Sequence, residues 1–298
     1  MMESLSATEV GRVAADALAE IAEKSVGGAP IYQFIDDCPV SWKTIADGGW
    51  DSVGVSETDG GGEASLRDLV EIAKAWGKTS IPLPLLETIW VKRWSAAARG
   101  LQGPLSVAVR RSQSGNSECI APFGALSGIS IARSIGGNDE FVTGPVGAPE
   151  TFAPSLLTTI VDVATTIPAG AASELAVIWA AESVGAAQQL LQLSVEYAKT
   201  REQFGNPIGS FQAIKHRLAD MHSDAEYAET AVIWASVEAD QAKRASLYAV
   251  DTSIRVAESA IQVHGGMGFT WEMGLHFYLR AMLTQRELIN GLWAHSTV

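Results

Sequence analysis

Cysteine is scarce in this sequence, since Cys38 and Cys119 are the only two among 298 residues. So few cysteines exclude a disulfide framework, and their spacing is not that of a zinc site. No uninterrupted apolar run reaches the ~18 residues that a membrane-spanning helix requires. The N-terminus also lacks the basic and apolar segments of a secretory signal. We therefore expect a cytoplasmic protein without membrane segments, with both thiols reduced.

Positive charge is also in short supply, because 21 lysine and arginine residues stand against 34 aspartate and glutamate residues. The formal net charge of -13 repels nucleic acid and anionic membrane surfaces, so we expect neither as a partner. The five histidines form no metal-ligand pattern, and we expect no metal. The apolar content of 47% is ample for a buried core, which predicts a globular protein.

Helical periodicity dominates the N-terminal third of the chain. Apolar residues recur at helical spacing in residues 7–24, 66–76 and 85–98. The glycines at 60–62 predict a turn, and Ser65 is placed to cap the helix that follows. We therefore predict an N-terminal helical domain over residues 1–103.

The middle of the chain has a different composition. Short β-prone runs, separated by Gly, Pro, Ser and Asn, extend from residue 105 to residue 163. This pattern predicts a small β domain over residues 104–165, and thus a fold that is mostly α with a reduced β domain.

The remaining residues, 166–298, predict a four-helix bundle. Two apolar stripes recur at three- and four-residue spacing, as expected for helices packed nearly antiparallel. The stripes are Phe211, Ile214, Leu218, Met221, Ala225, Ala228 and Val232, and then Leu247, Val250, Ile254, Ala257 and Ile261. The preceding helix is rich in alanine and glycine at residues 180–187, so neighbouring backbones can approach it closely. We expect that helix to be central.

Two short segments of the helical half hold residue types that suit a dinucleotide. Arg201 can grip two phosphate oxygens with its planar fork, and Phe204 offers an aromatic surface. Gly265 and Gly266 allow backbone N–H groups to approach a ligand. Taken singly, each has a plainer explanation, because arginine and glycine are common at helix C-termini.

Spacing makes the combination more specific. The pattern R-x-x-F-G-x-P-I-x-x-F-Q-x-x-K-x-x-L-A-D-M, followed by Q-x-x-G-G-x-G-F-x-x-E, resembles the acyl-CoA dehydrogenase family. W-D-S-V-G-V-S-E-x-x-G-G, D-L-V-E-I-A and L-P-L-L-E-T resemble the first helical domain of that family. The resemblance covers most of residues 40–95 and 165–280.

The resemblance implies a fold, a cofactor and a set of contacts. Family members consist of a helical domain, a β domain and a helical bundle, and they bind FAD at a dimer interface. The ADP half of FAD is held by the neighbouring subunit. The matching positions here are Arg201, Phe204, Gln212, Gln262, Val263, His264, Gly265 and Gly266. At His264 we expect backbone approach rather than chemistry by the imidazole.

The sequence departs from the family where the flavin ring would bind. The Y-x-x-T-E-P-x-A-G-S-D loop and the W-I-T-N stretch are absent from residues 104–164. The family's R-D-A-R appears as residues 280–283, R-A-M-L, and its G-T segment is missing. We therefore expect the ring to bind in a pocket of another chain.

A second departure concerns the glutamate that removes the α-proton of the acyl thioester. A gapless alignment places the family's two alternative base positions at Leu175 and near Ile289. Glu174 and Glu287 lie close by and are weak candidates. A one-residue offset turns a side chain by about 100° around a helix, so a solvated carboxylate is the better expectation for both.

These features favour a subunit of a heteromeric (α2β2) FAD-dependent acyl-CoA dehydrogenase of lipid metabolism, resembling the shortened subunits of actinobacterial steroid side-chain degradation. A full-length partner would supply the ring pocket and the glutamate, for an acyl-CoA substrate and an electron-transfer acceptor. Two alternatives remain: a self-sufficient homomeric enzyme that uses Glu174 or Glu287, and a scaffold subunit without flavin.

Overall fold

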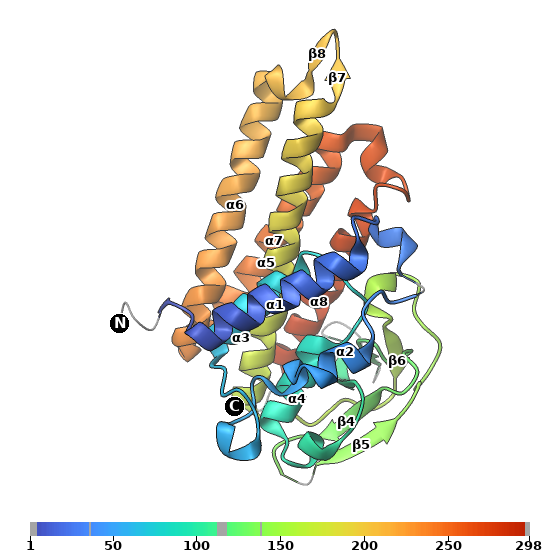
Figure 1. Cartoon of the computed structure of the whole chain (residues 1–298), viewed down its shortest axis with the longest axis vertical. Helices are drawn as coiled ribbons and strands as arrows, with labels where there is room; N and C mark the ends of the chain where they lie inside the picture. Colours follow the sequence, from blue (N-terminus) through green and yellow to red (C-terminus); the bar gives the residue numbers. More distant parts are fainter. Residues whose placement is uncertain (1–4, 36, 112–117, 138, 296–298) are drawn as a thin grey trace.

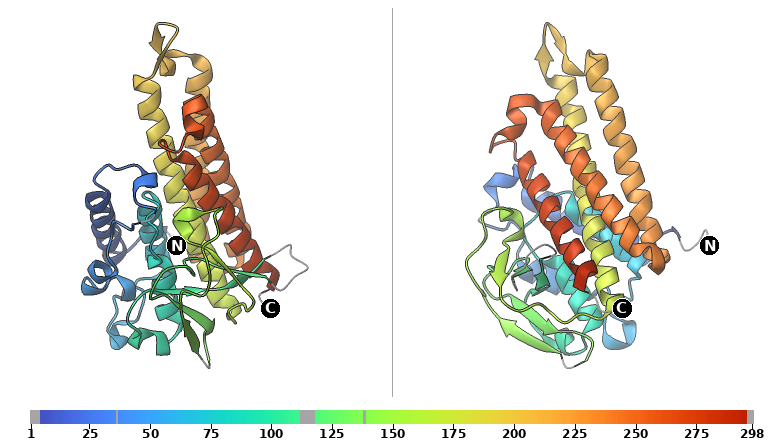
Figure 2. Two further views of the ribbon diagram at one scale, coloured as in Figure 1. Left: turned by 90° about the vertical axis from the view of Figure 1, so that its right-hand side faces the viewer. Right: turned by 180° about the vertical axis from the view of Figure 1, so that it is seen from behind.

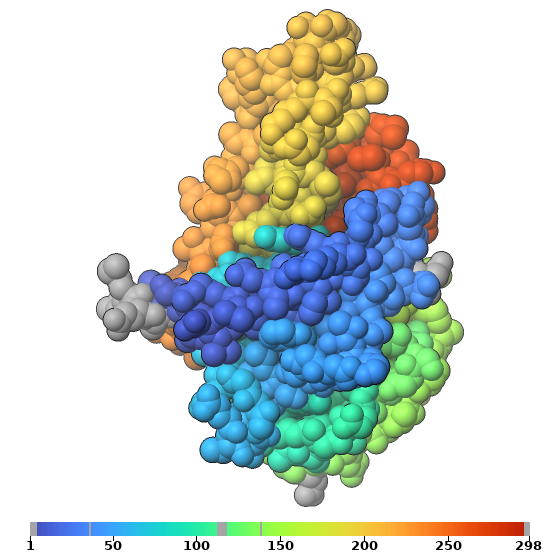
Figure 3. All heavy atoms as spheres, in the orientation of Figure 1, coloured from blue at the N-terminus to red at the C-terminus, as the bar shows by residue number. Residues whose placement is uncertain are grey.

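The protein is described by a computed structural model that covers residues 5–35, 37–111, 118–137 and 139–295. The N-terminal helices cross the lower half of a long helical bundle, and the strands of residues 105–161 lie beside them at the same end (Figure 1). The two longest helices of the bundle project beyond the rest of the molecule, as the space-filling view makes plain (Figure 3). None of the described helices combines the length and apolarity that crossing a membrane requires.

The N-terminal region is helical, as the periodicity predicts. Its helices are α1 (Glu9–Val26), α2 (Trp42–Asp47), α3 (Leu66–Gly77) and α4 (Leu85–Trp94). Ser65 caps α3 in a reciprocal capping box with Asp68, so this start was correctly predicted. Helix α4 ends earlier than the predicted residue 98. The hydroxyl of Ser95 accepts the Ala98 N–H at 3.1 Å, which starts a separate 3-10 turn.

The β region consists of two small three-stranded sheets. Its strands are β1 (Leu105–Val107), β2 (Val109–Arg110), β3 (Cys119–Ala121), β4 (Ser130–Ser134), β5 (Glu140–Thr143) and β6 (Thr159–Val161). The sheet orders are β1-β4-β5 and β2-β3-β6, and only the β1–β4 pair is parallel. No described strand exceeds five residues, and proline or glycine directly follows β3 and β5.

The C-terminal half is a bundle of α5 (Ala169–Thr200), α6 (Gln212–Val237), α7 (Ala242–His264) and α8 (Leu275–His295). Helix α5 packs against α3, α6, α7 and α8. Its crossing with α3 depends on glycine, because a Cβ on Gly185 would lie 1.9 Å from the Lys74 carbonyl oxygen. Gly77 likewise has no room for a side chain, since its Cβ would lie 2.1 Å from the Glu182 carbonyl oxygen. Small residues therefore bring these backbones into contact, as expected.

The apolar stripe of α6 is buried over only part of its length. Phe211 is exposed, Ile214 and Leu218 are half-buried, and full burial begins at Met221. The prediction of a continuous packed stripe was therefore wrong at its N-terminal end. The reason is that α5 and α6 extend beyond α7 and α8, so the first turns of α6 lack neighbours on that side (Figure 2).

Candidate cofactor site

The projecting end of the bundle carries a β-hairpin between α5 and α6, made of β7 (Glu202–Gln203) and β8 (Asn206–Pro207). Its two turn residues, Phe204 and Gly205, both have positive φ angles, of 53° and 79°. Glycine favours this conformation, but a bulky aromatic residue rarely adopts it. The Phe204 side chain is nevertheless 91% exposed. An aromatic ring held outward in a strained backbone is a feature of binding sites rather than of packing.

Arg201 directly follows α5, and its backbone completes the helix end. The Arg201 N–H donates to the Tyr197 carbonyl at 2.8 Å, and the Arg201 carbonyl accepts the Ile208 N–H at 2.7 Å. Its side chain is exposed and forms no hydrogen bond or ion pair with the residues that the structure describes. The backbone therefore serves as the cap, while the guanidinium stays available for an anion.

The second part of the site lies where α7 ends. Gly265 follows His264 with a φ of 59° and a ψ of -136°, and its N–H donates to the Gln262 carbonyl. A Cβ on Gly265 or on Gly266 would meet nothing within 4 Å, so this backbone borders open space. Gly268 differs, because a Cβ there would lie 2.5 Å from the Ile261 carbonyl oxygen. The two adjacent glycines are thus the pair that a ligand can approach.

The fold brings both parts of the site to the same end of the bundle. The Tyr197 ring of α5 stacks on the His264 ring of α7, with centroids 4.2 Å apart and planes 25° apart. Gln212 begins α6 beside the hairpin, and both Gln212 and Gln262 are exposed. Val263 and His264 differ from the other predicted contacts, since their side chains are only 5% and 4% exposed.

His264 is held as a neutral ring. Burial lowers the pKa of His264 below its usual value, so the imidazole carries no charge at neutral pH. Its Nδ1 lies 2.8 Å from the Ala260 carbonyl oxygen and therefore donates to it. This arrangement agrees with a supporting role for the side chain, with backbone approach at the glycines beside it.

These residues fit the ADP half of FAD. A diphosphate needs a cation and N–H donors, and an exposed guanidinium and an open glycine pair are present. An adenosine group needs a flat apolar surface, and Phe204 offers one. The exposure of Arg201 and Phe204 and the open space at the glycine pair are observations independent of the sequence pattern that first indicated these residues.

The two residues at which the gapless alignment would place a catalytic base, Leu175 and Ile289, are aliphatic and both are 0% exposed. The carboxylate of Glu174 accepts the Arg93 Nε–H at 3.0 Å and the Trp94 Nε1–H at 2.8 Å. Glu174 is therefore not the solvated carboxylate that we expected, because α4 packs against it. Glu287 is half-buried on α8.

A crevice remains between the β region and the ends of α5 and α8. It holds a cavity of about 330 Å³. Helix α8 approaches β2 so closely there that a Cβ on Gly291 would lie 2.2 Å from the Arg110 carbonyl oxygen. The described residues that line the cavity include neither a glutamate nor an aromatic side chain. The crevice thus lacks a planar surface for a flavin ring, and Asp162 supplies the one carboxylate among its described lining residues.

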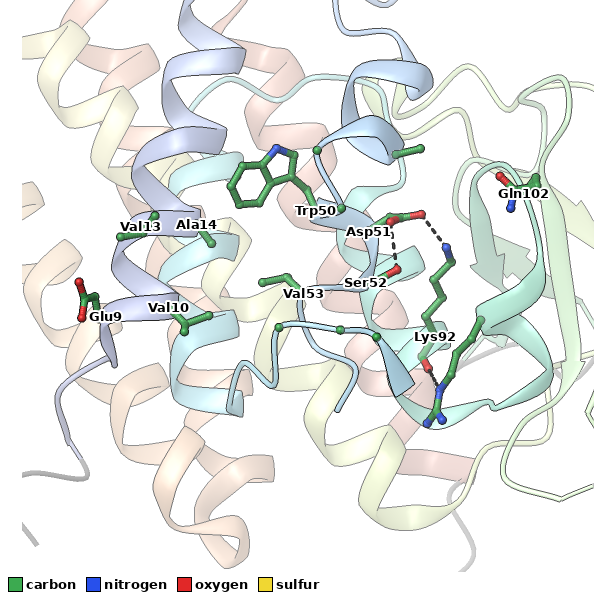
Figure 4. A pocket seen from close by; sticks show the side chains of 17 residues that line it. Glu9, Val10, Val13, Ala14, Trp50, Asp51, Ser52, Val53, Lys92 and Gln102 are labelled. Atoms are coloured by element: carbon green, nitrogen blue, oxygen red, sulfur yellow. Dashed lines mark hydrogen bonds and ion pairs between the residues drawn. The ribbon is translucent and has the colours of Figure 1, made fainter. Parts of the chain in front are cut away.

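A larger cavity, of about 650 Å³, lies in the N-terminal region. Figure 4 shows Val10 and Val13 of α1 on one side, with Asp51 and Lys92 on the other. The Lys92 ammonium and the Asp51 carboxylate form a buried ion pair at 2.6 Å. None of the predicted cofactor contacts lines this cavity.

Comparison with known proteins by sequence points to acyl-CoA dehydrogenases. A sequence model described as "Acyl-CoA dehydrogenase, C-terminal domain" matches residues 173–288. Acyl-CoA dehydrogenase IpdE2 of Mycobacterium tuberculosis is 30% identical over 247 residues, or 80% of this chain and 78% of the relative. IpdE2 of Mycolicibacterium smegmatis is 31% identical over 264 residues, or 84% of each chain. The chain belongs to the acyl-CoA dehydrogenase family.

Solved structures show the same fold. The ChsE4-ChsE5 complex from Mycobacterium tuberculosis matches with a TM-score of 0.72 at 20% identity, over 97% of this chain and 95% of that chain. Butyryl-CoA dehydrogenase from Megasphaera elsdenii matches with a TM-score of 0.69 at 15% identity, over 95% of each chain. The expected fold class is confirmed. Family membership supports FAD as the cofactor and an oxidoreductase that acts on acyl-CoA.

Sequence reasoning missed two acids that lie between helices, of which Glu87 is buried and Glu182 is half-buried. Glu87 of α4 accepts the Trp179 Nε1–H at 2.7 Å, and burial raises its pKa to about 7. Burial and the nearby Glu87 also raise the pKa of Glu182, which accepts a hydrogen bond from Gln285. Their partners are far apart in sequence, so no local pattern could have revealed them.

The recess that Glu182 lines is too small for a substrate. Glu182 and Gln285 line a recess of about 10 Å³, which is the size of one water molecule. Glu87 and Glu182 therefore join α4, α5 and α8 rather than act on a thioester.

Proposed function

We propose that this chain is the ADP-side subunit of a heteromeric FAD-dependent acyl-CoA dehydrogenase. In this proposal a full-length partner subunit supplies the flavin-ring pocket, the catalytic glutamate and the thioester site. The three regions would be residues 1–103, 104–165 and 166–298, of which the last provides the cofactor contacts and the subunit interface.

One observation carries the proposal. The residues for the ADP half are presented to solvent at the end of the bundle, whereas both base positions are occupied by buried aliphatic side chains, Leu175 and Ile289. A chain that had lost FAD altogether would have no reason to keep Phe204 exposed in a strained turn. A self-sufficient enzyme would need a carboxylate beside the thioester.

The chemistry divides accordingly between the two subunits. When bound, FAD supplies the acceptor for the hydride that leaves the β-carbon of the thioester. Arg201 would pair with the diphosphate, the Gly265–Gly266 backbone would donate N–H groups, and Phe204 would cover the adenosine. This chain thus binds and orients the ADP half of FAD, while a glutamate of the partner takes the α-proton.

Several relatives support a two-chain arrangement. The titles of two similar structures describe the ChsE4-ChsE5 complex and a Tcur3481-Tcur3483 steroid acyl-CoA dehydrogenase variant. Acyl-CoA dehydrogenase FadE34 of Mycobacterium tuberculosis is 30% identical over 84% of this chain but only 40% of its own length. More than half of that relative lies outside the match, enough for a second unit of this kind. We therefore propose a cytoplasmic heterotetramer, a steroid side-chain acyl-CoA as substrate, and a separate electron acceptor.

The test is the flavin content of the complex. The chain should be co-expressed with the acyl-CoA dehydrogenase-like chain encoded beside it, and the flavin-to-protein ratio of the purified complex measured. Arg201→Ala should release FAD, because the lost charge-assisted hydrogen bonds stabilise by about 1.5 to 3 kcal/mol. Arg244→Ala is a matched control, since this exposed arginine lies near the opposite end of α7.

The outcomes separate the three functions. FAD bound by the wild-type complex and lost in Arg201→Ala supports the proposal. Full flavin occupancy in Arg201→Ala contradicts it. A colourless wild-type complex would instead support the alternative that this chain is a scaffold subunit without flavin. A chain that binds FAD and oxidises an acyl-CoA alone would be the homomeric enzyme.

The homomeric enzyme also makes a distinct prediction about its base. We expect Glu174→Gln and Glu287→Gln to leave turnover of the complex nearly unchanged, because neither carboxylate occupies the base position. Loss of a true general base lowers the rate by about 10²- to 10⁴-fold. A loss of that size in either variant would place the base in this chain.

A further inference from the structure

The two parts of the proposed ADP clamp belong to different helices. Arg201 follows α5, while Gly265 and Gly266 follow α7. Neither part contacts the other through a hydrogen bond or ring contact between described residues. A diphosphate can engage both only if the two helix ends keep a fixed separation, since hydrogen bonds weaken steeply with distance and angle.

One contact joins the two helix ends at the level of the clamp. Tyr197 lies one turn before Arg201, and its carbonyl accepts the Arg201 N–H at 2.8 Å. His264 directly precedes Gly265. The rings of Tyr197 and His264 stack with centroids 4.2 Å apart. Tyr197 is therefore linked to Arg201 through the backbone, and His264 is linked to Gly265 in the same way. The stack of the two rings connects these two parts of the clamp.

The orientation of the His264 ring is also fixed. Its Nδ1 donates to the Ala260 carbonyl at 2.8 Å, which prevents the ring from turning about its Cβ–Cγ bond. The ring is neutral, so the stack needs no counter-charge. Two planes that cannot rotate freely define the spacing of the helices that carry them.

Two other contacts near the clamp lie within α5, the hairpin and the start of α6. Phe204 packs edge-on against Phe211 within the hairpin region, at 6.2 Å between centroids. Gly209 approaches the Ala198 carbonyl so closely that a Cβ would lie 2.9 Å from it, which joins the hairpin to α5. A cavity of about 610 Å³, lined in part by Tyr197, Thr200 and His264, borders the stack. The space beside the rings is thus not filled by other side chains.

We infer that Tyr197 and His264 are positioning residues, whose stacked rings set the distance between Arg201 and the Gly265–Gly266 backbone for FAD binding. This inference rests on the proposed function and adds a determinant of affinity that acts through the contact between the two rings. The family pattern gave His264 only a place in the motif, and it gave Tyr197 none.

The experiment measures the FAD dissociation constant of the assembled complex after removal and re-addition of flavin. Tyr197→Ala and His264→Ala should each weaken binding by roughly 3- to 10-fold, the value of one aromatic pair. Tyr197→Phe keeps the ring and should stay within about twofold of wild type. The double alanine variant should bind about as weakly as either single variant, since both remove the same contact.

A general loss of stability must be distinguished from a loss of positioning. Leu190→Ala truncates a fully buried side chain of α5 that is not part of the stack, so it should lower the thermal midpoint without lowering FAD affinity. Wild-type affinity in both alanine variants would overturn the inference. So would a Tyr197→Phe variant that binds FAD as weakly as Tyr197→Ala, or additive effects in the double variant.

Failure of the inference is separable from failure of the proposed function. If Arg201→Ala releases FAD while the ring variants do not, the clamp stands and the stack has no part in it. If Arg201→Ala also retains FAD, the clamp itself is wrong.

Discussion

At the scale of single residues, exposure distinguishes binding positions from structural ones. Arg201, Phe204 and Gln262 were predicted from the motif, and all three are exposed. The sequence could not show that Phe204 adopts a φ of 53°, because that depends on the two-residue turn. Nor could it show that Glu174 pairs with Arg93, which lies 81 positions earlier and on another helix.

The strain at Phe204 leads to a prediction about stability and binding. Phe204→Gly should raise the thermal midpoint of the complex, because glycine adopts this turn without the cost of about 1 to 2 kcal/mol that other residues carry. The same change should lower flavin content, because the aromatic surface is lost. A variant that is both more stable and fully loaded with FAD would show that the ring does not contact the cofactor.

The buried acid Glu87 predicts a dependence of stability on pH. Its pKa is raised from 4.5 to about 7 on folding. Protonation of Glu87 therefore contributes fully to the free energy of unfolding below pH 4.5, and this contribution is lost as the pH rises to about 7. The pKa shift corresponds to a loss of stability on the order of 3 kcal/mol. Between roughly pH 5 and pH 8, the thermal midpoint of Glu87→Gln should therefore fall less than the thermal midpoint of wild type.

The control for this prediction is Glu226→Gln, which changes an exposed glutamate of α6. It should follow the wild-type dependence on pH. An identical pH dependence for Glu87→Gln and wild type would mean that Glu87 ionises as freely in the folded protein as in the unfolded chain.

At the scale of elements, local rules predicted the starts of helices better than their ends. The capping box at Ser65 and the small residues of α5 were visible in the sequence. Helix α4 ends earlier than predicted, just before Ser95, whose hydroxyl also donates to Asp139, 44 positions away. The exposed start of α6 was missed because periodicity reports the spacing of apolar residues, not the length of the neighbouring helices.

The crossing of α3 and α5 provides a test at this scale. Gly185→Ala should destabilise the protein by about 1 to 3 kcal/mol or prevent its folding, because the new methyl group would overlap the Lys74 carbonyl. Gly170→Ala is the control, since its Cβ would lie 3.6 Å from the Trp94 ring, an ordinary contact. Equal thermal midpoints for the two variants would contradict the close approach of these backbones.

At the scale of the whole molecule, the order of helical, β and helical regions followed from composition and periodicity. The cofactor contacts followed from resemblance, because spacing alone could not tell a phosphate clamp from ordinary helix ends. Neither the crevice beside Gly291 nor the ring stack that joins α5 to α7 could be predicted from local patterns. Both depend on how distant segments pack against one another.

The most direct measurement of the central claim is an experimental structure of the heteromer with FAD. We expect the Arg201 guanidinium within hydrogen-bond distance of the FAD diphosphate, and the flavin ring inside the partner subunit. A flavin ring bound between β2 and α8 of this chain, with one of its own carboxylates directed at the substrate, would contradict the account.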